Sequence, residues 1–203
     1  LVRNIQSIDG LGLGGDEREI SVVFADVRGF TSFSEQIPPE DVMTIINRYL
    51  TSSTEAIQLF DGIIDKYMGD AVVGLFNTQL NPQTDHAERA VRAALTMAYD
   101  VRALHEVLAP DLRLHYGIGV DTGMAMLGNV GSPSRKEFTA LGAPINFAKL
   151  LQDNALPGEI IISENTLQCV RDLFEVEPLQ PRKVKGQFEF QVMYRVTGVK
   201  RRA

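Results

Sequence analysis

The chain has 203 residues, enough for one domain with a sizeable core, and its 44% hydrophobic and 23% charged content is ordinary for a globular protein. A formal net charge of −6 provides no basic footprint, so nucleic acid is excluded as the expected partner. The single cysteine, Cys169, excludes an intramolecular disulfide and fits a reducing cytoplasmic setting.

The first 18 residues carry little structural signal. Their glycine-rich end, GLGLGG at residues 10–15, reads as a linker that feeds the first strand. No apolar run along the chain reaches the roughly 18 residues of a membrane span, and no secretory signal pattern is present. We therefore expect a leader at 1–18, one domain at 19–198, a short tail at 199–203 and no membrane contact within this segment.

A buried strand that ends on a carboxylate is expected at residues 20–26, ISVVFAD. Gly29 permits a sharp reversal after it, and Thr31 begins a helix. A carboxylate at a strand end, beside free backbone N–H groups, suits a metal-bound phosphate chain, because the carboxylate binds the cation and the amides bind phosphate oxygens. The alternative is that Asp26 only caps the following helix.

A second element of the same shape lies in residues 63–76. Two short apolar runs flank the sequence MGDA, which predicts a β-hairpin with Asp70 at a strand end. If this hairpin lies beside the first strand, Asp26 and Asp70 can share one pair of cations. Two carboxylates alone bind Mg²⁺ incompletely, so water and substrate phosphates would supply the remaining ligands.

Two long helices are expected at residues 38–60 and 84–108, where apolar side chains recur at the helical period. Both are interpreted as structural elements that pack on a sheet. Residues 112–131 predict two strands joined by a turn at Asp121-Thr122-Gly123. A short strand at Phe138–Leu141 then leads into another helix.

The C-terminal third completes an α+β pattern. Pro144 suits the first turn of a helix in which Asn146 and Leu150, four residues apart, share one face. The elements expected after it are a strand at 159–162, a helix at 163–170 and a closing strand pair around Lys185-Gly186. The order predicts an α+β sandwich with an antiparallel or mixed sheet and helices packed on one side.

Six motifs in this order resemble the catalytic domain of the class III nucleotidyl cyclases. They are FADVRGFT (24–31), DKYMGDAVVGLF (65–76), GVDTG (119–123), GNVG (128–131), FTALGAPIN (138–146) and VKG (184–186). Together they cover about residues 18–197, and the pattern is most similar to bacterial adenylyl cyclases. The resemblance implies a ferredoxin-like core that works as a head-to-tail homodimer, with two active sites at the interface and a sensory module upstream.

The resemblance also implies how the site is divided between two protomers. One would bind two Mg²⁺ or Mn²⁺ ions through Asp26, Asp70 and the backbone carbonyl of Val27. Its backbone amides would hold the triphosphate of ATP, at Val27, Arg28, Gly29, Phe30 and Thr31. The other protomer would place Lys66 and Thr139 on the base, Asn146 near the ribose and Lys185 on the phosphates. The implied reaction is attack of the ribose 3′-oxygen on the α-phosphorus, with loss of pyrophosphate.

The residues that would contact the base favour ATP. A lysine ammonium only donates hydrogen bonds, so Lys66 suits the N1 acceptor of adenine and mismatches the protonated N1 of guanine. The hydroxyl of Thr139 can accept from the exocyclic amine. Guanine-specific relatives typically carry Glu and Cys, or a similar pair, at these two places.

Two positions depart from the family pattern. The family's transition-state arginine lies four residues after the asparagine, where this chain has Leu150. Lys149 precedes it, but one helix step turns a side chain by about 100°. A phosphate-contacting arginine of the family corresponds to Gly117. We therefore expect intact metal and substrate binding with reduced turnover.

Three functions remain open from the sequence. The favoured one is an ATP-cyclising enzyme of low turnover. The second is a catalytically impaired module that binds nucleotide or dimerises, and the third is a guanylyl cyclase or one that uses both nucleotides. Asp26, Asp70 and Lys66 favour an enzyme, whereas Leu150 favours the impaired module.

Overall fold

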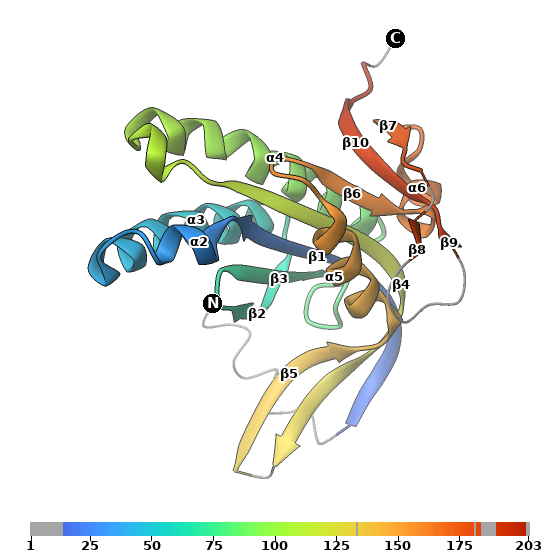
Figure 1. The fold of residues 1–203 in the computed structure, drawn as a ribbon. Helices are drawn as coiled ribbons and strands as arrows, with labels where there is room; N and C mark the ends of the chain where they lie inside the picture. Colours follow the sequence, from blue (N-terminus) through green and yellow to red (C-terminus); the bar gives the residue numbers. More distant parts are fainter. Residues whose placement is uncertain (1–13, 133, 181, 184–189, 202–203) are drawn as a thin grey trace.

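The computed structural model describes residues 14–132, 134–180, 182–183 and 190–201. Figure 1 shows a large sheet with helices packed against it, and two further short strands pair in a small sheet of their own. The strands are β1 (Gly14–Arg28), β2 (Ile63–Met68), β3 (Ala71–Phe76), β4 (His115–Ser132), β5 (Arg135–Leu141), β6 (Ile160–Ser163), β7 (Phe174–Pro178), β8 (Arg182–Lys183), β9 (Phe190–Gln191) and β10 (Met193–Val199). The helices are α2 (Phe30–Ser34), α3 (Pro39–Leu59), α4 (His86–Val107), the short 3₁₀ helix η1 (Pro110–Leu112), α5 (Ala143–Asn154) and α6 (Glu164–Val170).

The main sheet is mixed, as the sequence predicts. Its strand order is β2-β3-β1-β4-β6-β10-β7, and β5 pairs with β4 away from this path. The β4–β6 pair is parallel, and the other pairs in the sheet are antiparallel. Strands β3 and β4 flank β1 on its two sides, so the hairpin lies beside the first strand, which is the condition set above for Asp26 and Asp70 to act together.

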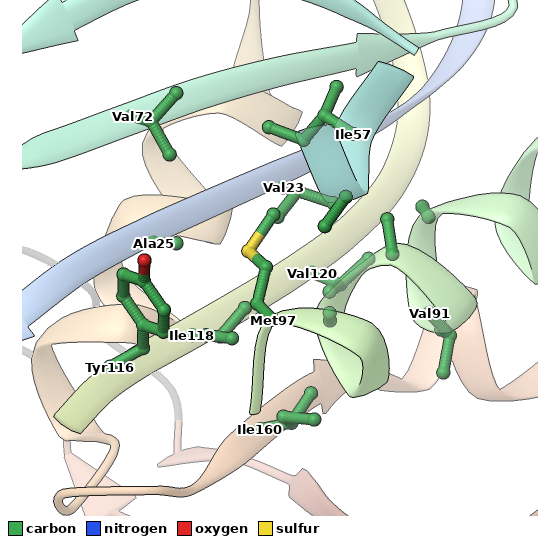
Figure 2. Packing of buried hydrophobic residues seen from close by; sticks show 14 of the residues in the cluster. Val23, Ala25, Ile57, Val72, Val91, Met97, Tyr116, Ile118, Val120 and Ile160 are labelled. Carbon is green, nitrogen blue, oxygen red and sulfur yellow. The ribbon is translucent and has the colours of Figure 1, made fainter. Parts of the chain in front are cut away.

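The side chains of β1 alternate between two hydrophobic clusters. Val23 and Ala25 face the larger cluster, which contains Ile57 of α3 and Met97 of α4. Figure 2 shows Met97 beside the strand residues of this cluster. The opposite face of β1 packs against α5, where Ala148 joins Ile20, Val22 and Phe24 in a second cluster. The prediction of helices on one side is therefore wrong, because both faces of β1 are apolar and each requires a cover.

One predicted turn is also wrong. Asp121-Thr122-Gly123 lies inside β4, which runs without interruption from His115 to Ser132 and bends along its length (Figure 1). These three residues stay in register with Val22, Ser21 and Ile20 of β1, so their backbone groups are paired in the sheet. The Thr122 hydroxyl also contacts the Ser21 hydroxyl at 2.7 Å. Tertiary pairing with β1 thus overrides the local turn preference of the sequence.

Other predictions agree with the structure apart from their ends. Helices α3 and α4, the β2–β3 hairpin, and β6 with α6 occupy the expected segments. The strand predicted from residue 20 begins earlier, at Gly14, where its exposed residues give no apolar alternation. The closing strand pair expected around Lys185-Gly186 is confirmed by the antiparallel pairing of β8 with β9, although residues 184–189 themselves lie outside the described part of the chain. Within the described part of the chain, no helix combines the length and apolar character needed to cross a membrane.

Candidate active site

Two aspartates lie together at one end of the β1–β3 pair. Asp26 is two residues from the end of β1, and its cross-strand partner is Ala71. Asp70 immediately precedes Ala71, in the turn between β2 and β3 that Gly69 makes with a φ of 65°. Sheet register therefore brings together the two carboxylates that the sequence singled out.

The electrostatics of this pair suit a cation. Burial raises the pKa of Asp70, and the negative charge of Asp26 raises that pKa further. Burial also raises the pKa of Asp26, against the lowering effect of Arg28 and Lys149. Among the described residues, no three His, Cys, Asp or Glu side chains gather into a ready-made metal site. The two carboxylates could thus supply part of a ligand shell, with oxygens of the backbone, water or a substrate completing it.

The chain reverses immediately after Asp26. Gly29 has a φ of 79°, in the left-handed region, and precedes α2. The amide of Phe33 donates to the Gly29 carbonyl at 3.0 Å, whereas the first amides of a helix have no acceptor within it. Phe30 and Thr31 open this helix, and Val27 is buried, so Val27 can offer only its backbone to a ligand. The segment proposed to hold phosphates is therefore a turn beside the two aspartates.

The side chain of Arg28 was missed from sequence, where only its amide was considered. Its Nη1 lies 3.8 Å from Asp26 Oδ1, and its Nη2 donates to the backbone carbonyl of Gln152. With the Gln152 amide oxygen turned toward the guanidinium, that oxygen accepts from Nη1 at 3.1 Å and from Nη2 at 3.0 Å. A Cβ at Gly117 would lie only 2.1 Å from Arg28 Nε. The space left by the expected arginine at 117 is thus filled by an arginine from β1.

A diagonal register explains this placement. Gly117 pairs with Asp26, so Arg28 lies two residues along β1 from the residue opposite Gly117. Side chains at such diagonal positions are within reach of long residues such as arginine. Glycine at 117, where the family carries arginine, together with an arginine two residues after Asp26, is the signal that sequence reasoning could have used.

Lys66 and Thr139, the predicted base-contacting pair, meet across two strands. Lys66 Nζ on β2 donates to Thr139 Oγ1 on β5 at 3.1 Å. Asp65, which sequence reasoning also missed, joins them: its Oδ2 lies 3.3 Å from Lys66 Nζ. The chain thus places a cation, a hydroxyl and a carboxylate together within one protomer.

The remaining predicted residues lie on α5 or outside the description. Asn146 is exposed and Leu150 half-buried on α5. Lys149 faces β1: its Nζ lies 5.4 Å from the Phe24 ring centroid and 2.7 Å from the Asp153 carboxylate, and its charge lowers the pKa of Asp26. Lys185 lies outside the described residues.

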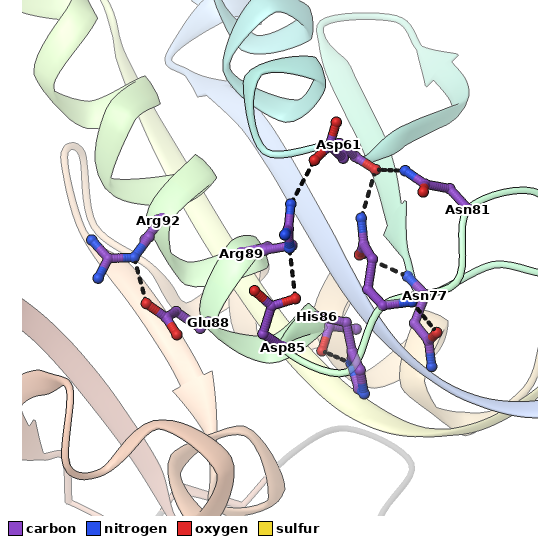
Figure 3. A network of polar contacts seen from close by, with 10 residues as sticks. Asp61, Asn77, Asn81, Asp85, His86, Glu88, Arg89 and Arg92 are labelled. Atoms are coloured by element: carbon purple, nitrogen blue, oxygen red, sulfur yellow. Dashed lines mark hydrogen bonds and ion pairs between the residues drawn. The ribbon is translucent and has the colours of Figure 1, made fainter.

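A separate polar cluster surrounds a hollow of about 420 Å³ beyond the opposite end of β3. In Figure 3, Arg89 is held between Asp61 and Asp85, at 2.6 Å from each carboxylate. Asn77 follows β3 directly, whereas Asp70 precedes this strand. Both aspartates neutralise Arg89, so the cluster stabilises the loop between β3 and α4. Its position at the opposite end of β3 separates it from Asp26 and Asp70.

The sequence matches a known family over most of its length. Residues 15–198 match the adenylate and guanylate cyclase catalytic domain. Adenylate cyclase 1 of Rhizobium meliloti (strain 1021) is 31% identical over 191 residues, which cover 91% of this chain and 28% of that protein. The adenylate cyclase of Anabaena cylindrica is 32% identical over 200 residues, covering 94% of this chain and 39% of that protein. This chain therefore spans well under half the length of these relatives.

Solved structures show the same architecture. The adenylyl cyclase CyaB from P. aeruginosa superposes with a TM-score of 0.86 and 28% identity, covering 93% of this chain and 98% of that chain. The guanylyl cyclase Cya2 superposes with a TM-score of 0.82 and 33% identity, covering 93% and 96% respectively. The structural likeness therefore includes cyclases named for either nucleotide. From the family match over residues 15–198 and the shared fold, the chain belongs to the class III nucleotidyl cyclases.

Proposed function

We propose that this domain is an adenylyl cyclase, which converts ATP to 3′,5′-cyclic AMP and pyrophosphate at sites shared by two copies. The observation that carries the proposal is the contact between Lys66 Nζ and Thr139 Oγ1, at 3.1 Å. This contact places a donor, the Lys66 ammonium, beside an acceptor, the Thr139 hydroxyl, and these complement the N1 acceptor and the exocyclic amine of adenine. The names of the relatives from Rhizobium meliloti and Anabaena cylindrica support the same choice.

The choice of base follows from hydrogen-bond polarity. Lys66 only donates, so it would satisfy adenine N1, whereas the protonated N1 of guanine would face a second donor. Thr139 can accept from the exocyclic amine of adenine. Guanine carries an acceptor oxygen at that place, to which a hydroxyl could also donate, so the mismatch that disfavours guanine at this level is the one between its N1–H and Lys66.

The family uses divalent metal ions, and the residues at the end of β1 fit such ions. Asp26, Asp70 and the backbone carbonyl of Val27 would hold two Mg²⁺ or Mn²⁺ ions. When bound, the metals would lower the pKa of the ribose 3′-hydroxyl and stabilise the charge on departing pyrophosphate. The backbone from Val27 to Thr31 would orient the triphosphate, so that the 3′-oxygen lies in line with the α-phosphorus as the bond to pyrophosphate breaks.

We further propose that two copies associate head to tail. Met126 and Leu141 face each other across β4 and β5, yet they are 47% and 55% exposed, and Met124 on β4 is 51% exposed. Exposed apolar surface of this kind marks an interaction site. A second copy on this face would cover it. Lys66, Thr139 and Asn146 of one copy would then act on the nucleotide held by the aspartates of the other, with Lys185 on its phosphates.

Leu150 supports slow turnover, and it also favours the second candidate, an impaired nucleotide-binding module. Its side chain has no hydrogen-bond donor where the family places a transition-state arginine. Loss of one preorganised donor costs a factor of about 10²–10³ in turnover, so activity would be reduced but measurable. The relatives' greater length supports a domain that works within a longer chain carrying an upstream sensory module. The expected cytoplasmic setting stays a prediction.

The proposal is tested by incubating purified protein with ATP or GTP and Mn²⁺, then separating the cyclic products. We expect cyclic AMP in excess, and loss of product in Asp26→Ala with an unchanged unfolding transition. Failure to form either cyclic nucleotide, with nucleotide still bound, would leave the impaired module.

Mixing variants tests the shared site. Asp26→Ala and Lys66→Ala chains should each be inactive alone, since each would spoil both sites of its homodimer. A mixture should recover activity, because one site of each heterodimer would contain both intact residues. No recovery despite verified subunit exchange would contradict a site built from two copies.

A further inference from the structure

A β-bulge places Asp65 beside the base-contacting pair. The pairing of β2 with β3 shifts between Ile64 and Lys66, so Asp65 has no partner in the register. In a regular strand, neighbouring residues point to opposite faces, whereas a bulge redirects a side chain. Here Asp65, Lys66 and Thr139 gather at one place: the lysine donates to the Thr139 hydroxyl at 3.1 Å, and the same ammonium lies 3.3 Å from the Asp65 carboxylate. The Thr139 hydroxyl lies close enough to Asp65 to lower the pKa of that carboxyl.

The three groups fix the direction of each hydrogen bond. Lys66 has only donors, so Thr139 Oγ1 must accept from it. The one hydroxyl proton of Thr139 therefore points away from Lys66, and the ionised Asp65 carboxylate beside the same lysine is an acceptor for it. The second lone pair of Oγ1 is then the group left to face a ligand. Thr139 is only 6% exposed, so bulk water competes little for these bonds.

Burial makes the arrangement sensitive to loss of the carboxylate. The Asp65 side chain is 2% exposed, and its Oδ1 has no hydrogen-bond partner among the described residues. The charge is balanced by Lys66, whose Nζ lies 3.3 Å from Oδ2. Burial raises the pKa of Asp65, while Thr139 and Lys66 lower it. A buried carboxylate that holds one cation and one hydroxyl has the chemistry of a positioning group.

We infer that Asp65 is a positioning residue that sets nucleotide selectivity by holding the Thr139 proton away from the base. With the proton held, Thr139 accepts from the exocyclic amine of adenine and presents a lone pair to the oxygen of guanine. Without Asp65, the hydroxyl is free to rotate and donate to that oxygen. This inference rests on the proposed use of ATP and adds the residue that determines the preference.

The test compares nucleotide selectivity in Asp65→Asn, Thr139→Val and the double variant, all with Mn²⁺. Binding of 3′-deoxy-ATP and 3′-deoxy-GTP is measured by calorimetry, because these analogues lack the attacking hydroxyl and report selectivity without turnover. The kcat/KM ratio for ATP over GTP is measured alongside. Glu137→Gln is the matched control: it removes a negative charge near Asp65 from an exposed side chain on the same strand as Thr139.

We expect Asp65→Asn to lower the ATP preference at least tenfold in both measurements, mainly through a gain for the guanine nucleotide. Glu137→Gln should keep the natural ratio. In the Thr139→Val background, Asp65→Asn should change the ratio less than twofold, because the hydroxyl through which it acts is gone. If Asp65→Asn does not fold, Asp65→Ala must lower the ratio instead.

The outcomes separate the inference from the proposed function. An unchanged ratio in a folded Asp65 variant, with cyclic AMP still formed by the natural chain, overturns the inference alone. An equal effect of Asp65→Asn with and without the Thr139 hydroxyl also overturns it. Natural protein that binds neither deoxy nucleotide overturns both. If the natural protein binds the deoxy nucleotides selectively but forms no cyclic product, the catalytic proposal is overturned. The inference about Asp65 is then decided by the binding selectivity of its variants alone.

Discussion

Asp121 is predicted to make the domain less stable as the pH rises toward neutrality. It lies in the middle of β4 with 4% of its surface exposed. Burial raises the pKa of its carboxyl to about 6, although hydrogen bonds with the Ser163 hydroxyl and the Thr122 backbone lower it. Its Oδ1 has no hydrogen-bond partner among the described residues. The ionised side chain is therefore held in surroundings that favour the protonated form.

The sign and size follow from proton linkage. The folded chain binds this proton more tightly than the unfolded chain, whose aspartate has the ordinary pKa of 3.8. The stability contributed by protonation is complete below that value and is lost as the pH rises through about 6. The whole difference corresponds to about 3 kcal/mol, of which about half falls between pH 5 and pH 8.

Equilibrium unfolding in urea at several pH values provides the measurement. Asp121→Asn cannot titrate, so its free energy of unfolding should fall about 1.5 kcal/mol less than that of the natural chain between pH 5 and pH 8. Comparing the change with pH cancels the constant cost, about 1–3 kcal/mol, of burying an amide N–H group without a partner. Asp111→Asn, at an exposed position on η1, is the control. Parallel pH profiles for the natural chain and Asp121→Asn would refute the reasoning.

Two further predictions concern turnover and packing. Leu150→Arg should raise kcat at least about tenfold with little change in KM, in a steady-state assay of cyclic AMP, because a guanidinium would act mainly in the transition state. An unchanged kcat there, with activity abolished by Lys149→Ala alone, would mean that the lysine has taken that role. Gly119→Ala should lower the urea midpoint strongly, because a Cβ would lie 2.1 Å from the Ala148 carbonyl oxygen. Gly198→Ala, whose nearest contact would be at 3.8 Å, should lower it much less.

Local patterns were sufficient for the parts of the site that depend on the chain immediately around them. The apolar run before Asp26, the hairpin residues around Asp70, and Pro144 at the start of α5 each fixed an element near its true place. The pairing of β1 with β3 then follows once the two strands share a sheet. The sequence therefore places each carboxylate at a strand end, whereas their proximity depends on the β1–β3 pairing that the structure shows.

What sequence reasoning missed depends on register between distant segments. The proposed positioning role of Asp65 depends on the bulge in β2 and on the proximity of Thr139 on β5, which is 73 residues from Lys66 in the chain. The turn expected at Asp121–Gly123 was overridden by pairing with β1 over the whole length of β4. The position of α5 on the second face depended on both faces of β1 being apolar. The first two are not visible in a window of neighbouring residues, because each is a choice between alternative partners. The third could have been read from residues 20–25, where apolar side chains occupy both faces of the strand.

The Arg28 guanidinium lies over Gly117, where it occupies the volume that a side chain at position 117 would need. A Cβ at 117 would collide with Arg28, so a long side chain at 117 and the present Arg28 rotamer exclude each other. Residues at these two positions should therefore change together among relatives, with arginine at one accompanied by a smaller or differently directed residue at the other. For protein engineering, arginine introduced at 117 alone would force the Arg28 guanidinium out of its present position beside Asp26. The two positions should be substituted as a pair.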